Sequence, residues 1–234
     1  MDVSTRKKRI VIDYYTDILC VWAYFGQVKV DELKREFGDR IELRYRFIPL
    51  FGCCEQRIGQ GWEEGGYEGY SRFVLELAND FPHVEVHPEI WRRNAPASSL
   101  PAHLTLKAVE LLEQSGTLPP LEPEAPSRFE RLMWNLRLAF FRDLENIGDR
   151  AVLHRHLRAL EIPVEAVERE IASGRAYAAM AEEMEEQRAR GIEGSPTFLM
   201  NEGRQRLYGN VGYRAIAANV QELLERKLDI PSWC

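Results

Sequence analysis

The sequence predicts an α/β fold in which one sheet carries a large helical insertion. Segments with strand character lie only near the two ends of the chain, and an amphipathic segment with helical spacing separates the first two of them. The long stretch between the two ends has helical periodicity almost throughout. The expected order is therefore β-α-β, a helical block, and then β-β-α.

At the N-terminal end, residues 9–15 (RIVIDYY) are rich in β-branched and aromatic residues and predict a strand. After a polar break, the apolar residues between Val21 and Phe37 recur at helical spacing, and Gly38 ends this helix. Residues 41–48 (IELRYRFI) alternate as a second strand. A β-α-β unit of this kind predicts two parallel strands joined by a right-handed crossover.

A glycine-punctuated loop after Pro49 leads into the helical block. The expected helices cover about 68–79, 99–115, 128–146, 150–160, 164–172 and 175–190. Strand character returns with TFLM from Thr197, followed by a turn at 201–203 and a return strand in QRLYG. An amphipathic helix over 212–228 should pack on the sheet.

The composition bounds the class of protein. The chain has 234 residues, 45% of them hydrophobic, and a formal net charge of −6, which excludes a largely disordered chain and argues against a nucleic-acid or anionic-membrane partner. Asp13 and Asp17 interrupt the first apolar run, which indicates neither a signal peptide nor a membrane span. Four cysteines without an export signal then predict a cytoplasmic protein with free thiols.

Three loops should converge at one edge of this sheet. They are residues 17–20, 49–54 and 194–196, and the carboxyl edge of an open α/β sheet is where ligands usually bind. Cys20 would lie at the start of the first helix, where backbone amides and the helix dipole stabilise an anion. Such a position can lower a cysteine pKa from about 8.5 to between about 3.5 and 7.5, which makes the thiolate a nucleophile. The alternative is a small buried thiol under the sheet.

The sequence resembles the DsbA-like branch of the thioredoxin superfamily in three segments. YYTDILCVWAYFG is similar to its D-x-x-C-P-W-C-Y active-site segment, and GIEGSPTFLMNEGRQRLYGNVGY is similar to its cis-proline segment. LRLAFFRDLENIGDRAVL resembles the helical insertion of the FrnE-like cytoplasmic members and of kappa-class glutathione transferases. Related 2-hydroxychromene-2-carboxylate isomerases belong to the same group.

This resemblance implies a thioredoxin-like domain made of residues 1–57 and 190–234, with 58–189 as an all-helical insertion subdomain. It implies that Cys20 is the catalytic thiol and that Pro196 is a cis-proline beside it. The implied substrate-binding residues are Trp22, Tyr24, Ser195 and Thr197. Ser195 would offer backbone groups to an extended substrate or to glutathione, as in strand addition, and Trp22 would form an apolar wall beside the thiol.

The active-site segment departs from the redox pattern at one position. Ala23 stands where the redox members have the second cysteine of C-x-x-C, so a disulfide cannot form within the motif. The remaining chemistry uses one thiol, through a mixed disulfide. Cys53 or Cys54 could resolve a Cys20 adduct or could be ordinary loop thiols, and Cys234 has no expected role.

No metal site is expected, because the spacing of the histidines and cysteines matches no standard zinc pattern. No cofactor should be tightly bound, although glutathione could serve as a co-substrate.

Three functions follow from these expectations. The first is a cytoplasmic DsbA/FrnE-like thiol-disulfide oxidoreductase or isomerase that works through Cys20 on a thiol or disulfide of a small molecule or peptide. The second is a kappa-like glutathione transferase or isomerase, although GNVGYR departs from the expected G-x-D-R pattern. The third is a redox-dead binding module of the same fold. A lowered Cys20 pKa favours the enzymes and a normal or raised pKa favours the binding module. A homodimer is compatible with all three.

Overall fold

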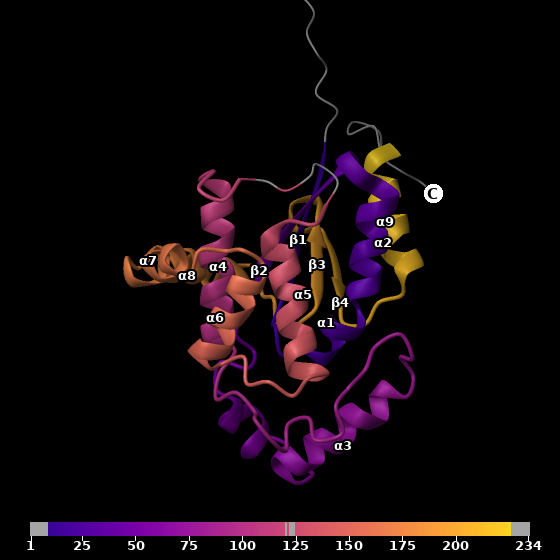
Figure 1. The fold of residues 1–234 in the computed structure, drawn as a ribbon. Coiled ribbons are helices and arrows are strands. Elements are labelled where there is room, and N and C mark those ends of the chain that lie inside the picture. Colours follow the sequence, from indigo (N-terminus) through magenta and orange to yellow (C-terminus); the bar gives the residue numbers. More distant parts are fainter. Residues whose placement is uncertain (1–8, 120, 122–124, 226–234) are drawn as a thin grey trace, which may run out of the picture.

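The computed structural model describes residues 9–119, 121 and 125–225, and its centre is a four-stranded mixed sheet (Figure 1). The strands are β1 (Ile10–Thr16), β2 (Ile41–Phe47), β3 (Thr197–Met200) and β4 (Gln205–Tyr208), in the order β2-β1-β3-β4. β1 pairs with β2 in parallel and with β3 antiparallel, and β3 pairs with β4 antiparallel. The predicted topology of the sheet is therefore confirmed.

The helix expected over 21–37 is two helices, so this prediction is wrong in detail. α1 (Val21–Phe25) and α2 (Gln27–Phe37) meet at Gly26, whose N–H bonds to the Trp22 carbonyl at 2.9 Å. A Cβ at position 26 would lie only 2.9 Å from that same oxygen, so the tight connection requires glycine.

At the other end of the chain, α9 (Tyr213–Glu225) lies beside α2, as Figure 1 shows. The predicted continuation of this last helix to Leu228 lies outside the described residues.

Between β2 and β3 the described residues form helices and loops without a strand, as predicted. The elements are η2 (Glu55–Gly59), α3 (Gly66–Ala78), α4 (Leu100–Gln114), α5 (Arg128–Phe141), α6 (Arg150–Ala159), α7 (Val164–Ala172) and α8 (Arg175–Ala189). α5 ends at Phe141 and not near residue 146, because the chain leaves the helix and Leu144 adopts a positive φ of 57°. In the described part of the chain, none of the helices is long and apolar enough to span a membrane.

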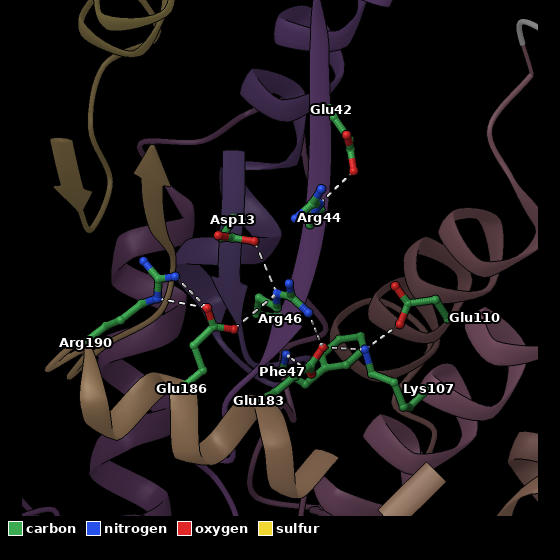
Figure 2. Close-up of polar contacts among 10 residues, drawn as sticks. All are labelled: Asp13, Glu42, Arg44, Arg46, Phe47, Lys107, Glu110, Glu183, Glu186 and Arg190. Atoms are coloured by element: carbon green, nitrogen blue, oxygen red, sulfur yellow. Dashed lines mark hydrogen bonds and ion pairs between the residues drawn. The ribbon is translucent and has the colours of Figure 1, made fainter. Parts of the chain in front are cut away.

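A cluster of charges, in which Glu183 and Lys107 are buried, joins the insertion to the edge of the sheet (Figure 2). Glu183 of α8 accepts a hydrogen bond from the backbone N–H of Phe47 at 3.0 Å, and that N–H belongs to the edge strand β2. The same carboxylate pairs with Lys107 of α4 at 2.6 Å and with Arg46 at 3.4 Å. Arg46 also pairs with Asp13 of β1 at 3.2 Å. These contacts cover the outer edge of β2, which would otherwise present unpaired backbone groups.

One hydrophobic core runs through both parts of the molecule. The largest cluster of buried apolar side chains includes Tyr14 and Phe198 from the sheet together with Leu106 and Phe140 from the insertion. The domain boundaries at residues 57 and 190 remain a prediction from the resemblance.

Candidate active site around Cys20

Cys20 occupies the N-cap position of α1, directly after the loop that leaves β1, as the sequence predicted. Its backbone N–H bonds to the carbonyl of Asp17 at 3.1 Å, and its own carbonyl accepts from the amides of Ala23 and Tyr24. The side chain is 5% exposed. Cys20 is thus held at the helix start with only a small part of its surface open to solvent.

The loop before β3 lies against this thiol. Sγ of Cys20 donates a hydrogen bond to the carbonyl oxygen of Ser195 at 3.2 Å. Oγ of Ser195 accepts a hydrogen bond from the backbone N–H of Asp17 at 3.0 Å. The peptide bond between Ser195 and Pro196 is cis. The loops at 17–20 and 194–196 therefore meet, as the predicted sheet topology requires.

The carboxylate of Asp17 joins the third loop to the other two. Its Oδ1 accepts from the backbone N–H of Leu19 at 2.9 Å. Its Oδ2 accepts from the backbone N–H of Phe51 and from the hydroxyl of Ser99, each at 2.9 Å. Asp17 is fully buried, and three donors satisfy its charge. The sequence analysis gave Asp17 no role, although an acidic residue at a buried strand end was the available signal.

A second buried polar residue, His103 of α4, supports the same loop. Its Nε2 accepts the backbone N–H of Ile18 at 3.0 Å, so this nitrogen carries no proton. The ring stacks on Phe47 at a centroid distance of 4.8 Å. Burial lowers the pKa of His103, while the charge of Asp17 raises it less, and the imidazole is therefore neutral. No sequence spacing pointed to this residue, since its partner is a backbone amide 85 positions away.

A cavity of about 400 Å³ opens beside the thiol. Its walls are strongly aromatic and carry two charged residues. The lining residues are Cys20, Val21, Trp22, Leu50, Phe51, Arg57, Ile58, Trp62, Tyr70, Phe73, Glu193, Gly194, Ser195 and Tyr208. A volume of this size lies in the range of small-molecule sites, about 300–1,000 Å³.

Three of the residues expected to bind substrate or to react line this cavity: Cys20, Trp22 and Ser195. Tyr24 lies away from it, because its ring stacks on Phe141 at 4.6 Å and its hydroxyl donates to the carbonyl of Glu85. Thr197 is buried, and its hydroxyl donates to the carbonyl of Gly194 at 2.8 Å. The sequence analysis missed the contributions of α3 and η2 to the cavity walls, since no motif marks them.

The sequence analysis expected the helix N-terminus to lower the pKa of Cys20, and this expectation is wrong. Burial raises the pKa of this thiol, and the charge of Asp17 adds to the rise. The side-chain hydroxyl of Ser195 and the backbone amides of Ala23 and Trp22, all of which can donate to a thiolate, lower the pKa but more weakly. The helix start does favour the thiolate, as predicted, but loss of solvent outweighs it. Cys20 is protonated at neutral pH in this structure.

Cys53 and Cys54 do not line the cavity. Cys53 is exposed, while Cys54 is buried with its Sγ directed to the carbonyl of Phe51 at 3.5 Å. Burial raises the pKa of Cys54 to about 12. All three described cysteines are free, and Cys234 lies outside the described residues. Within the described ranges, no group of three or more His, Cys, Asp or Glu side chains is placed to hold a metal ion.

Comparison with known proteins identifies the fold. No protein-family model matches the chain, and no curated protein matches it by sequence. Among solved structures, it is similar to a probable DsbA oxidoreductase from Streptomyces coelicolor, with a TM-score of 0.68 and 18% identity over 96% of this chain and 95% of that one.

Two further solved structures are also similar to this chain. The cytosolic disulfide reductase DsbM from Pseudomonas aeruginosa has a TM-score of 0.62 and 18% identity over 91% of this chain and 99% of that one. A 2-hydroxychromene-2-carboxylate isomerase has a TM-score of 0.62 and 15% identity over 95% and 100%. The chain therefore has the thioredoxin-like fold of DsbA-like structures, with a helical insertion in its mixed α/β sheet.

Proposed function

We propose that the protein is a thiol-disulfide oxidoreductase or isomerase that works through Cys20 alone. The observation that carries this proposal is the position of Cys20 at a helix start, in the wall of a cavity and bonded to the loop of the cis-proline. Ala23 occupies the place of a second thiol and is fully buried. The intermediate is then a mixed disulfide between Cys20 and the substrate.

The exchange reaction takes place between the Cys20 thiolate and the disulfide of the substrate. Cys20 loses its proton to solvent, and its thiolate attacks one sulfur of the substrate disulfide. A bond forms between Sγ and that sulfur, while the substrate S–S bond breaks and its second sulfur leaves as a thiolate. The thiol of a small molecule then attacks the sulfur of the substrate in the mixed disulfide, a new disulfide forms, and Cys20 is released as a thiolate.

Glutathione is the co-substrate we propose for this cycle, in the cytoplasm. DsbM, a cytosolic disulfide reductase, was solved with GSH, and that structure has a TM-score of 0.64 to this one at 17% identity over 91% of this chain and 99% of that one. The cavity beside Cys20 also has the size of a small-molecule site.

The test uses a protein in which Cys53, Cys54 and Cys234 are replaced by serine, so that Cys20 is the only thiol. Reduced protein is incubated with glutathione disulfide across a range of pH, and intact mass is measured. We expect one glutathionyl adduct, which is absent when Cys20 is also serine. Absence of an adduct at every pH at which the fold is intact would overturn the proposal.

Two other functions each have one supporting observation. The raised pKa of Cys20 favours a binding module without redox activity. In that case, glutathione disulfide would form no adduct with the protein that retains Cys20. Replacing Cys20 by serine would leave the binding of an extended peptide unchanged.

The aromatic walls of the cavity favour a glutathione-dependent transferase or isomerase that acts on a small organic molecule. Turnover of an aromatic electrophile with reduced glutathione, without a protein adduct, would support that function.

A further inference from the structure

The cavity beside Cys20 contains two charged side chains of opposite sign, Arg57 and Glu193. They come from distant segments, η2 and the loop before β3. Neither side chain makes an ion pair or a hydrogen bond with any residue that the structure describes. Both side chains are exposed, so their charges are open to a ligand that enters the cavity.

The position of Arg57 is held by local structure. η2 is a single π-helical turn, a rare element that is frequent at functional sites. The guanidinium of Arg57 lies over the ring of Phe51 at 4.8 Å from its centroid. Phe51 is fixed in turn by the hydrogen bond from its N–H to Asp17. The cation is thus tied to the loop that carries Cys20, while its N–H groups remain available.

Glu193 is placed by the same loop that receives the Cys20 hydrogen bond. The next residue, Gly194, lies directly under the ring of Tyr208, since a Cβ there would be 2.1 Å from a ring carbon. Ser195 follows, with its carbonyl bonded to the thiol. The carboxylate of Glu193 is therefore attached to a packed segment, two residues from the oxygen that contacts Sγ.

Apart from Arg57 and Glu193, the walls of the cavity are mostly apolar or aromatic, so these two side chains are the charged groups that a ligand in it would meet.

We propose that the Cys20 cavity selects a zwitterionic, amino-acid-derived thiol or disulfide, whose carboxylate pairs with Arg57 and whose ammonium group pairs with Glu193. This inference rests on the proposed function and specifies its substrate class. A ligand with only one of the two charges would pair with only one of these side chains. Arg57 and Glu193 then determine specificity, and the chemistry stays with Cys20.

The experiment compares four small disulfides that differ mainly in charge: cystine (zwitterionic), 3,3′-dithiodipropionate (anionic), cystamine (cationic) and hydroxyethyl disulfide (neutral). Each is mixed with reduced protein in which Cys20 is the only thiol, and the rate of formation of the mixed disulfide is followed by intact mass. In each case Cys20 gains one half of the probe and the other half leaves as a free thiol. Comparing variants with the same probe cancels its intrinsic reactivity.

Arg57→Gln should slow the reaction with dithiodipropionate and cystine about fivefold, which corresponds to loss of one solvent-exposed charge pair. The same variant should react with cystamine and with hydroxyethyl disulfide at rates within about twofold of those of the parent protein. Glu193→Gln should slow the reactions with cystamine and cystine and leave the rates with dithiodipropionate and hydroxyethyl disulfide unchanged. The matched controls Arg93→Gln and Glu222→Gln change the same charges at exposed positions outside the cavity and should change no rate.

The outcomes separate the inference from the proposed function. If all four probes form adducts and neither variant changes their relative rates, the inference fails and the thiol function stands. An equal slowing of all four probes would assign the two residues a structural role and would also overturn the inference. If no probe reacts with Cys20, the proposed function itself is wrong.

Discussion

Oγ of Ser195 accepts a hydrogen bond from the backbone N–H of Asp17 at 3.0 Å, across a separation of 178 positions. This contact fixes the loop before β3 against the loop that carries Cys20. Ser195→Ala should destabilise the fold by about 1–3 kcal/mol, because it leaves the buried N–H of Asp17 without an acceptor. Urea denaturation measures the loss, and Ser115→Ala at an exposed position serves as control. Equal stability of the two variants would contradict this role.

Asp17→Asn should lower the stability of the fold but raise the reactivity of Cys20. The variant loses the charge that accepts three hydrogen bonds, which should cost about 2–3 kcal/mol. Because the negative charge of Asp17 raises the pKa of Cys20, the same variant should lower that pKa and speed alkylation at neutral pH. Asp39→Asn, at an exposed position, should change neither quantity. A slower alkylation in Asp17→Asn would refute the electrostatic argument.

The rate at which Cys20 is alkylated should rise at higher pH than the rate for a free cysteine does. Burial raises its pKa, so the thiolate fraction grows only above a pH of about 8.5 in the ligand-free protein. The measurement is the rate of iodoacetamide alkylation against pH, with Cys53, Cys54 and Cys234 replaced by serine. A midpoint well below pH 8 would show that the helix N-terminus outweighs burial after all.

His103 should make the fold sensitive to acid. Burial lowers its pKa below that of the unfolded chain, so the unfolded state binds the proton more readily. The contribution of His103 to stability is therefore complete above about pH 6.5 and is lost as the pH falls below that value. His103→Gln keeps an acceptor for the N–H of Ile18 and removes the titration.

The test of this linkage is the difference in unfolding free energy between wild type and His103→Gln from pH 5 to 8. Glu183, whose pKa burial raises, contributes a slope of opposite sign in both proteins and cancels in the difference. A difference that does not change with pH would show that His103 does not titrate in this window.

The buried pair of Lys107 and Glu183 should be strongly coupled (Figure 2). Lys107→Met leaves the buried carboxylate of Glu183 with Arg46, at 3.4 Å, as its remaining charged partner, and should cost about 3–5 kcal/mol. Glu183→Gln should cost less, since the amide oxygen still accepts the N–H of Phe47. A double-mutant cycle by urea denaturation should give a clear coupling energy, and additive effects would contradict the pairing.

The sequence alone determined the architecture and the position of the thiol. Alternation in the first and second strands, helical spacing between them and turn residues at 201–203 are local signals, and the structure confirms the sheet topology that they predict. The same patterns placed Cys20 at a helix start. The cis state at Pro196 came from resemblance to a family, because no local pattern specifies it.

Tertiary structure decided the environment of that thiol. The helix start favours a thiolate, but whether the pKa of Cys20 falls or rises depends on how much solvent remains, and this is set by segments far away in sequence. Asp17, His103 and Arg57 acquired their roles in the same way, through contacts with backbone groups and rings that the fold brings together. Local patterns encode where helices and strands form, whereas desolvation and charge pairing depend on the packed neighbours of each group.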